Sequence, residues 1–395
     1  MNEWKECTIS DIGMVVGGAT PSTKKPENYE GGDIPWITPK DLSSFNGRYI
    51  SRGNRNITEV GLKSCSTQVL PTHSILFSSR APIGYVAIAQ NQVCTNQGFK
   101  SVVPNEDTDY LFLYYLLKYN KERIEHMGSG TTFKEVSGNT MKEICVKVPT
   151  SIDAQRRIAG VLDAIDSKIE QNEEINKNLL EQALTLYTTQ FSSLEKNGCI
   201  GNYCTVKSGF AFKSSWWTNI GVKVIKIGSI NQDNLNLLEC SYVDEDKVDK
   251  AKDFVVKAGD LLIAMTGATI GKFAMVPYSS EVLLVNQRVG KFFLGNNPVE
   301  KLPFIYCTLK QPEVYGEVVN RGQGSAQPNI SASDIMSIPC VIPSQEAIND
   351  FNDAVQPLFN LIVSNQRENQ QLSELRDTLL PKLMSSELDV SDIDC

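Results

Sequence analysis

The sequence has no run of 18 or more apolar residues and contains only two histidines, His73 and His126. A chain without such a run does not supply the helix of about 20 apolar residues that crosses a bilayer. Its first residues, MNEWKE, also lack the basic and then apolar pattern of a secretion signal. We therefore expect a cytoplasmic protein with no membrane contact.

The ten cysteines are scattered, with no C-x-x-C pair, and the two closest are Cys199 and Cys204. Zinc sites are built from cysteines and histidines at short spacings, and few are available here. We expect no metal site, and thiols that are reduced and mostly buried.

The motifs of common enzymes are also missing. The sequence has no G-x-x-x-x-G-K-[ST] phosphate loop, no H-E-x-x-H and no G-x-S-x-G. It lacks the glycine-rich cofactor turn and the Asn/Asp-Pro-Pro-aromatic motif of a methyltransferase, and neither histidine has a plausible nucleophile–base setting. We expect a protein that is not an enzyme, with no catalytic residue and no cofactor of its own.

The net charge of −8 is unevenly distributed over the 395 residues, a length that suits two domains. Residues 1–150 carry 16 basic and 15 acidic side chains, and residues 196–343 carry 15 and 13. The acid is concentrated in residues 151–195, with 4 basic and 8 acidic, and in 344–395, with 3 and 10. Neither long segment has the basic surface of a protein that binds DNA tightly alone, so a DNA reader of this composition needs a partner to attract phosphates.

An internal repeat organises the chain. Residues 128–149 (GSGTTFKEVSGNTMKEICVKVP) align without a gap to residues 322–343 (GQGSAQPNISASDIMSIPCVIP), at an offset of 194. Upstream, ILFSSRAPIG at 75–84 resembles LLIAMTGATIG at 261–271. The repeat predicts five segments: domains at 1–150 and 196–343, helices at 151–195 and 344–386, and an acidic tail at 387–395.

The two helical segments share a heptad seam, in which apolar residues recur at alternating spacings of four and three. The first seam lies at positions 158, 162, 165, 169, 172, 176, 179, 183 and 186, and the second at 351, 355, 358, 362, 365, 369, 372, 376 and 379. Pro357 should kink or restart the second helix, and Pro381 should mark its fraying end.

Both seams carry two consecutive asparagines, Asn172 with Asn176 and Asn365 with Asn369. One interpretation is a solvated face on a single surface helix. The presence of the pair in both halves favours two helices packed antiparallel, with 172 facing 369 and 176 facing 365. The other predicted contacts of this coiled coil involve Ile169, Leu179, Ile362 and Leu372.

The domains mix short strands and helices, so we predict an α+β fold. Residues 67–77, 84–93, 260–265 and 271–277 have the composition of strands, whereas 110–127 and 302–319 have the apolar spacing of helices.

Candidate contact residues are polar, non-acidic side chains at related positions of the two halves. Arg, Asn and Gln can make paired hydrogen bonds to base edges, and Ser, Thr and Lys suit phosphates. In the first half the candidates are Thr38, Lys40, Ser79, Arg80, Asn96, Gln97, Thr131 and Lys134. In the second half they are Lys226, Thr266, Lys272, Asn286, Arg288, Arg321, Gln323 and Gln327.

Two alternatives remain open for these residues. Asn96-Gln97 and Asn286-Gln287 recur in both halves, which equally suits structural turns that hold each domain together. Arg80, Lys134, Arg288, Arg321 and Gln323 differ between the halves and better suit sequence readout. Trp216-Trp217 could stack on bases, although an apolar anchor is the favoured interpretation.

The chain resembles the specificity subunits of Type I restriction-modification systems. TISDI at 8–12, GGATP at 17–21 and GGDIPWIT at 31–38 resemble the start of the first target recognition domain of that family. LSELRDTLLPKLMS at 372–385 resembles the end of its second helix. The start of the second domain departs from this pattern, so its target need not be similar.

The resemblance implies two homologous target recognition domains that each read one half of a bipartite DNA target, separated by an antiparallel coiled coil that sets the spacer. It also implies partners: two modification subunits that bind S-adenosylmethionine and methylate adenine, and restriction subunits that use ATP. A rival hypothesis, a standalone nucleic-acid-modifying enzyme, predicts activity of the purified chain. Another, a scaffold module, predicts no retention of target DNA.

Overall fold

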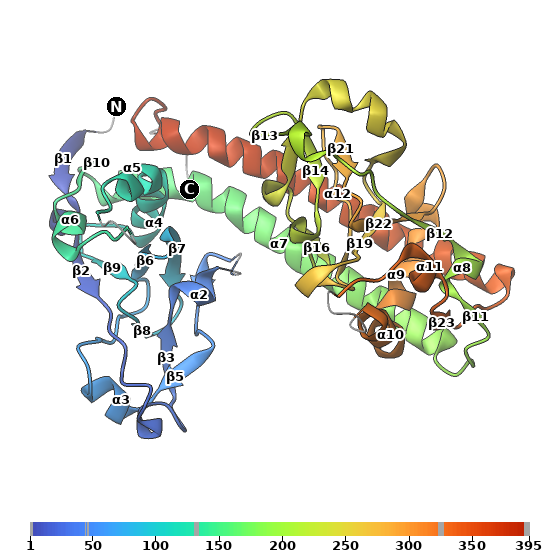
Figure 1. The fold of residues 1–395 in the computed structure, drawn as a ribbon. Coiled ribbons are helices and arrows are strands. Elements are labelled where there is room, and N and C mark those ends of the chain that lie inside the picture. The colour runs from blue at the N-terminus through green and yellow to red at the C-terminus, as the bar shows by residue number, and fades with distance from the viewer. Residues whose placement is uncertain (1–2, 44, 46, 130–133, 323–327, 391–395) are drawn as a thin grey trace. The chain divides into compact units, whose positions relative to one another are not determined.

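The computed structural model describes residues 3–43, 45, 47–129, 134–322 and 328–390 (Figure 1). The chain divides into a first unit, residues 1–170 with 372–395, and a second unit, residues 171–371. The two longest helices, α7 (Ile152–Phe191) and α12 (Gln345–Met384), contribute to both units. Each unit therefore combines a globular part with a length of both helices.

The sequence repeat reappears as a repeat of structural elements. The helices α7 and α12 begin at residues 152 and 345 and end at 191 and 384, an offset of 193 at both ends. The short helices α6 (Gly138–Lys142) and α11 (Ala332–Met336) are offset by 194 at both ends. The predicted repeat of an α+β domain followed by a long helix is confirmed.

The first globular part contains a five-stranded sheet, a three-stranded sheet and a two-stranded ribbon. The five-stranded sheet has the order β2 (Gly13–Gly17), β9 (Lys100–Pro104), β6 (Ile75–Ser79), β7 (Ile83–Ala89) and β4 (Tyr49–Ile50). The three-stranded sheet is β5 (Arg55–Ile57), β3 (Ile34–Ile37) and β8 (Cys94–Thr95), and the ribbon is β1 (Trp4–Thr8) with β10 (Cys145–Pro149). Its other helices are α1 (Ile9–Ile12), α2 (Pro39–Leu42), α3 (Glu59–Lys63), α4 (Tyr110–Tyr119) and α5 (Lys121–His126).

The second globular part contains a four-stranded sheet, a five-stranded sheet and two ribbons. The four-stranded sheet is β12 (Thr205–Ser208), β22 (Val289–Phe293), β19 (Leu261–Ala264) and β20 (Phe273–Met275). The five-stranded sheet is β13 (Trp217–Thr218), β17 (Ser241–Val243), β14 (Val222–Ile225), β21 (Leu283–Val285) and β18 (Val255–Val256). The ribbons are β11 (Gly198–Cys199) with β23 (Pro339–Cys340), and β15 (Ile230–Asn231) with β16 (Asn234–Leu235); the helices are α8 (Ile200–Tyr203), α9 (Leu302–Lys310) and α10 (Pro312–Gly322).

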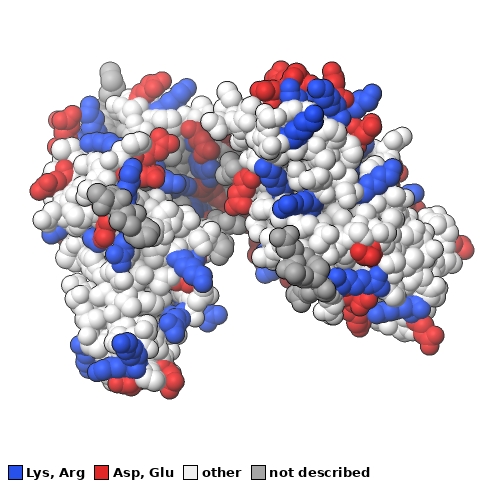
Figure 2. Space-filling view, viewed as in Figure 1, with Lys and Arg blue, Asp and Glu red and all other residues white. Residues whose placement is uncertain are grey.

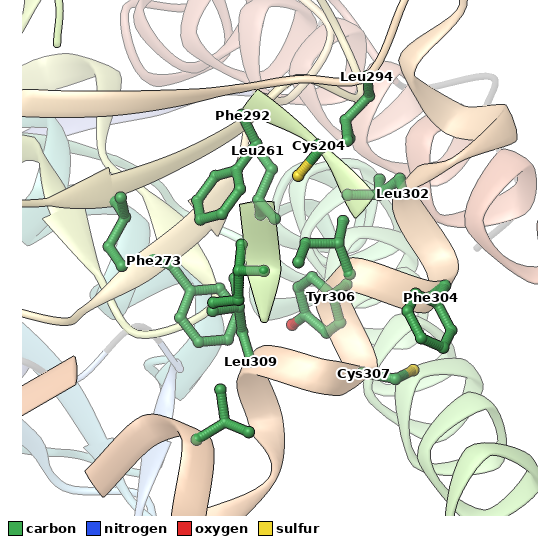
Figure 3. Packing of buried hydrophobic residues seen from close by; sticks show 14 of the residues in the cluster. Cys204, Leu261, Phe273, Phe292, Leu294, Leu302, Phe304, Tyr306, Cys307 and Leu309 are labelled. Atoms are coloured by element: carbon green, nitrogen blue, oxygen red, sulfur yellow. The ribbon is translucent and has the colours of Figure 1, made fainter. Parts of the chain in front are cut away.

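The core of the second globular part lies between its sheet and the long helices. Figure 3 shows Tyr306 and Leu309 of α9 on the side of the strand residues Leu261, Phe273 and Phe292, and the Tyr306 ring lies 5.5 Å from that of Phe273. On the other side of α9, the aromatic ring of Tyr187 lies 5.7 Å from that of Phe304. The end of α7 is thus part of the core of this globular part.

The two long helices pair antiparallel, as predicted. In the second unit the amide of Asn172 donates a hydrogen bond of 2.7 Å to Asn369, and that of Asn365 donates one of 2.9 Å to Asn176. Leu179 and Ile362 lie in one apolar cluster beside these polar layers. In the first unit Leu162 belongs to an apolar cluster, and Leu379 packs against that cluster. The predicted contact residues Ile169 and Leu372 are half-buried there.

The predicted first seam is wrong at its last position, because Leu186 is 48% exposed. Beyond Ala183 the buried positions are Tyr187 and Phe191, so the spacing changes from four and three to four and four. This part of α7 packs on the aromatic core of the globular part. A different face of the helix is therefore buried there.

The structure contradicts a restart of the second helix at Pro357. The helix α12 runs without interruption through Pro357, which lies on an exposed face. The carbonyl of Asp353, which a proline four residues later leaves without its helical partner, belongs to an exposed residue and can bond to water. The helix also continues past Pro381 to Met384.

Local polar residues shorten several predicted elements. The helix predicted over 110–127 divides into α4 and α5 at Asn120, whose side chain donates to the carbonyl of Leu116. The helix predicted over 302–319 divides into α9 and α10 at Gln311, which is extended because Pro312 follows it. Residues 67–74 are not a strand, and β6 begins only after a turn at residues 71–74. The other predicted strands are present but shorter.

Truncation of the seam should destabilise the protein in proportion to burial. Ile362 is 2% exposed and its neighbour Leu361 is 45% exposed, so the two form a matched pair. We expect Ile362→Ala to lower the free energy of unfolding by about 2–5 kcal/mol. Leu361→Ala should cost less than about 0.5 kcal/mol. Urea unfolding followed by circular dichroism measures both, and equal losses would contradict the pairing.

Candidate functional site

In each globular part, loops from different strands meet in the same arrangement. In the first unit, the backbone amide of Val136 donates to the carbonyl of Ser79 at 2.9 Å, and the amide of Ser79 donates to Gly98 at 2.7 Å. In the second unit, the amide of Ile330 donates to Met265 at 2.9 Å, and that of Met265 donates to Arg288 at 3.0 Å. We name these regions the first loop edge (residues 17–20, 79–81, 95–98 and 134–137) and the second loop edge (208–211, 265–269, 286–288 and 328–332).

The repeated asparagines form the same turn in both edges. The backbone amide of Asn96 donates to the carbonyl of Ile37 and that of Asn286 donates to Ile225, each at 3.0 Å. The side-chain oxygen of Asn96 accepts from the amide of Gly98 at 2.8 Å, and that of Asn286 accepts from Arg288 at 3.3 Å. These bonds support the interpretation of both asparagines as structural turn residues.

A glycine lies directly against each of these turns. A Cβ atom at Gly18 would lie 2.2 Å from the carbonyl oxygen of Asn96, and one at Gly209 would lie 2.5 Å from that of Asn286. No side chain fits at these distances, so the close approach requires glycine. These glycines were not identified as site residues, although Gly17-Gly18 and Ser208-Gly209 hold related places in the repeat.

The candidates of the first loop edge differ in what they can reach. The guanidinium of Arg80 lies 3.5 Å from the carboxylate of Glu135, which also pairs with Lys100 at 3.3 Å. Ser79 is fully buried and its hydroxyl donates to the carbonyl of Gly98. Gln97 is exposed, and its side-chain carbonyl accepts a hydrogen bond from Thr20.

The remaining candidates of the first half are Thr38, Lys40, Lys134 and Thr131. Thr38 precedes α2 and its hydroxyl donates to Asp41 at 2.7 Å, so it caps this helix. Lys40, in α2, and Lys134 are exposed. Thr131 lies outside the described residues.

The second loop edge contains a groove of about 1120 Å³. Its walls include the exposed side chains of Gln287 and Arg288 and the half-buried Thr266. The hydroxyl of Thr266 is buried and has no hydrogen-bond partner among the described residues. No acidic residue is among the described residues that line the groove. The groove therefore presents hydrogen-bonding groups and one positive charge, which suits an anionic polymer with hydrogen-bonding edges.

Sequence reasoning missed part of this groove. Ser208, Asn329 and Ser331 also line it, and none of them was a candidate. Asn329 and Ser331 belong to the repeated segment at 322–343, which was the signal available for finding them.

The remaining candidates of the second half lie elsewhere. The ammonium of Lys226 lies 3.5 Å from the centre of the Trp217 ring, and burial lowers the pKa of this lysine. Lys272 is half-buried. Arg321 is held by three internal partners: Glu317 at 2.8 Å, the carbonyl of Asp334 at 3.1 Å and the hydroxyl of Ser337 at 2.6 Å. Gln323 and Gln327 lie outside the described residues.

The favoured interpretation of the tryptophan pair agrees with its packing. Trp217 and Trp216 pack against an apolar cluster that contains Phe212 and Val224. Three lysines, Lys213, Lys247 and Lys250, also lie over the Trp216 ring, at 5.2–5.7 Å. Both rings therefore serve as anchors within the domain.

The surface charge agrees with the near-neutral composition of the globular parts. Figure 2 shows lysine and arginine side chains interspersed with acidic ones on the visible face of each unit. No group of three His, Cys, Asp or Glu side chains in the described part of the chain is arranged to hold a metal ion. Within those residues, no helix combines the length and apolarity needed to cross a membrane.

Comparison with known proteins decides the family. The model of the Type I restriction modification DNA specificity domain matches residues 1–181 and, a second time, residues 195–374. The chain belongs to this family. Because the family model matches both halves, the internal repeat is a repeat of the specificity domain.

Its relatives support this assignment over the whole length. The Type I restriction enzyme MjaIX specificity subunit of Methanocaldococcus jannaschii is 34% identical over 418 aligned residues, which cover 99% of this chain and 95% of that protein. The EcoR124I/EcoR124II specificity subunit of Escherichia coli is 32% identical over 171 residues, 42% of this chain and 41% of that one. The S subunit of a Type I restriction-modification system from M. genitalium has the same fold, with a TM-score of 0.54, 18% identity and coverage of 97% and 96%.

The contacts of two arginines in this specificity-domain protein predict different effects on its folding. Arg321→Ala removes three internal hydrogen bonds and should lower the free energy of unfolding by about 1–3 kcal/mol. Arg288→Ala removes an exposed side chain and should change stability by less than about 0.5 kcal/mol. Thermal melting of the two variants measures the difference. A larger loss in Arg288→Ala would mean that this side chain is structural.

Proposed function

We propose that this protein reads the DNA target of a Type I restriction-modification complex, with each globular part contacting one half of a bipartite sequence. The observation that carries the proposal is the loop edge, which recurs in both units with the same backbone scaffold but, apart from the shared Gln97 and Gln287, with different exposed side chains. A shared scaffold with different side chains is the arrangement expected of two readers of different half-sites. The names of the relatives, which are specificity subunits, agree with a role in recognition rather than in catalysis.

The second loop edge supplies the clearest reading residues. Arg288 can donate two hydrogen bonds to O6 and N7 of guanine, and Gln287 can pair with adenine. The hydroxyl of Thr266, buried without a described partner, would gain one from a bound nucleic acid. In the first loop edge, Gln97 and Lys134 are the exposed candidates. Arg80 would have to break its ion pair with Glu135 before it could contact DNA. Asn96 and Asn286 act on this account as supports of the reading loops.

The partners follow from the charge of the chain and from the family. The globular parts carry nearly balanced charge, so much of the attraction to double-stranded DNA would come from partner subunits. These would be two modification subunits, which bind S-adenosylmethionine and methylate adenine, together with restriction subunits that use ATP.

The paired helices would set the unread spacer and dock the modification subunits. They expose apolar side chains as well as acidic ones: Ile175, Leu186, Leu361 and Leu375 are 42–48% exposed. Such side chains on a helix surface are suited to burial in an interface with a partner.

Removal of Arg288 should affect one base position. In the complex reconstituted with its modification subunits, Arg288→Ala should cost about 1–3 kcal/mol of binding free energy on the correct target, which slows its methylation. It should also relax selectivity at one position of the second half-site. Lys40→Ala, which removes an exposed lysine of the first half, should leave that position selective. Methylation of a library of target variants measures both. A uniform loss over all targets would assign Arg288 to a phosphate contact instead.

Exchange of one globular part should change one half-site. We expect a chain whose residues 1–149 come from a related subunit to methylate targets that differ only in the first half-site. The second half-site should persist, because residues 196–343 are unchanged. Genomic DNA is treated with the reconstituted complex, and sequencing of its methylated adenines gives both half-sites. A change in both half-sites would show that the two readers are not independent.

A further inference from the structure

Arg48, which is buried, joins the first globular part to the helix α7 through contacts with two half-buried carboxylates. Its side chain is 7% exposed. The guanidinium donates two hydrogen bonds to the carboxylate of Glu170, at 2.8 and 2.7 Å. It also donates to Ser167 at 3.0 Å and forms an ion pair with Asp163. All of these groups belong to the first unit.

The spacing of the three acceptors matches the helix. Residues 163, 167 and 170 are spaced four and then three positions apart, so they lie on one face of α7. Asp163 and Glu170 each follow a seam residue, Leu162 and Ile169. Arg48 therefore contacts two turns of α7 beside the seam. Its planar bidentate contact with Glu170 fixes the orientation of the guanidinium on the helix as well as its distance.

The same network reaches the second long helix. The hydroxyl of Tyr115, in α4, donates to Asp166 at 2.8 Å, and Arg376 of α12 donates to the other oxygen of Asp166 at 2.9 Å. The guanidinium of Arg48 lies 3.5 Å from the Tyr115 hydroxyl. The globular part, α7 and α12 thus meet in one connected polar cluster.

Burial makes the geometry of this cluster specific. Burial opposes the charge on Arg48, but its hydrogen bonds and its attraction to Glu170 outweigh that effect and raise the pKa of the guanidinium. An arginine held charged in a buried place is unfavourable in any arrangement that separates it from its carboxylates. Small rotations of the globular part on α7 are therefore opposed.

The corresponding positions of α12 carry no charged side chain. At the repeat offset of 193, Gln356 takes the place of Asp163, Asn360 that of Ser167 and Val363 that of Glu170, while Phe359 takes that of Asp166. Phe359 is fully buried and lies edge-on to Tyr306, with ring centres 5.4 Å apart. This second joint is oriented by neutral hydrogen bonds, from the backbone amide of Phe304 to Asn352 and between the hydroxyls of Tyr187 and Thr308, each at 3.0 Å, where the first has an arginine and its carboxylates.

We propose that Arg48 is a positioning residue that fixes the orientation of the first globular part on α7 and thereby restricts the complex to one spacer length. This inference rests on the proposed function, in which the two globular parts read half-sites at a fixed separation. Arg48 touches no base on this account, and it acts through the helix.

The test measures spacer choice separately from base choice. The reconstituted methyltransferase complex is offered DNA that carries both correct half-sites with spacers from two base pairs shorter to two longer than the natural one. For Arg48→Gln we expect methylation at the neighbouring spacers, relative to the natural spacer, to rise by about tenfold, as for the loss of a charge-assisted contact. Glu170→Gln, changed from the helix side, should have the same effect, and Arg48→Lys should have a smaller one.

Controls separate the possible failures. Arg52→Gln removes an exposed arginine four residues away and should leave the spacer ratio unchanged. If the wild-type complex methylates no bipartite target, the proposed function fails. If it does, and neither Arg48→Gln nor Glu170→Gln changes the ratio, the positioning role is overturned. Should Arg48→Gln fail to fold, Arg48→Lys and Glu170→Gln decide the question, since each keeps part of the network.

Discussion

The pairing of α7 and α12 is the contact on which the rest of the structure depends. A helix of 40 residues with an apolar seam cannot remain in water alone, because the seam must be buried against another surface. The two helices bury these seams against each other and against the globular parts, so they contribute to both units and belong to neither alone. The arrangement of each globular part on the helices then decides what its loop edge can reach.

The asparagine layers explain why this pairing has one register. Amides at a buried seam lower stability compared with apolar residues, and they are satisfied only when they meet each other. Asn172 meets Asn369, and Asn365 meets Asn176, in a single antiparallel alignment. A shift by one heptad would place an amide against Leu179 or Leu372, and the buried hydrogen-bonding groups would lose their partners.

Periodic features could be predicted from the sequence, and features that depend on distant loops could not. The helices, their direction and the Asn172–Asn369 contact follow from the spacing of apolar residues and from the repeat, because both are visible in the sequence itself. The predicted burial of Leu186 was wrong because Tyr187 is buried in its place. Tyr187 packs on the globular core, which is built from another part of the chain. Arg321 has the right chemistry for reading bases, yet its acceptors at Asp334 and Ser337 come from a later helix. The Arg48 cluster joins residues 115–122 positions apart, and no local pattern marks it.

The two joints differ in a way that bears on how such proteins diversify. Arg48 lies on one side of Pro149 and its acceptors Asp163 and Glu170 lie on the other, so a recombination event at that boundary separates a cation from its anions. A new first domain would dock correctly on α7 only if one of its own loops supplies a positive charge for Asp163 and Glu170. The second joint is built from neutral groups, among them Phe359 packed on Tyr306 and the hydrogen bond from the Phe304 amide to Asn352, so its match is one of shape and hydrogen bonding rather than of charge. Gene exchange should therefore move first domains within lineages that share the charged joint.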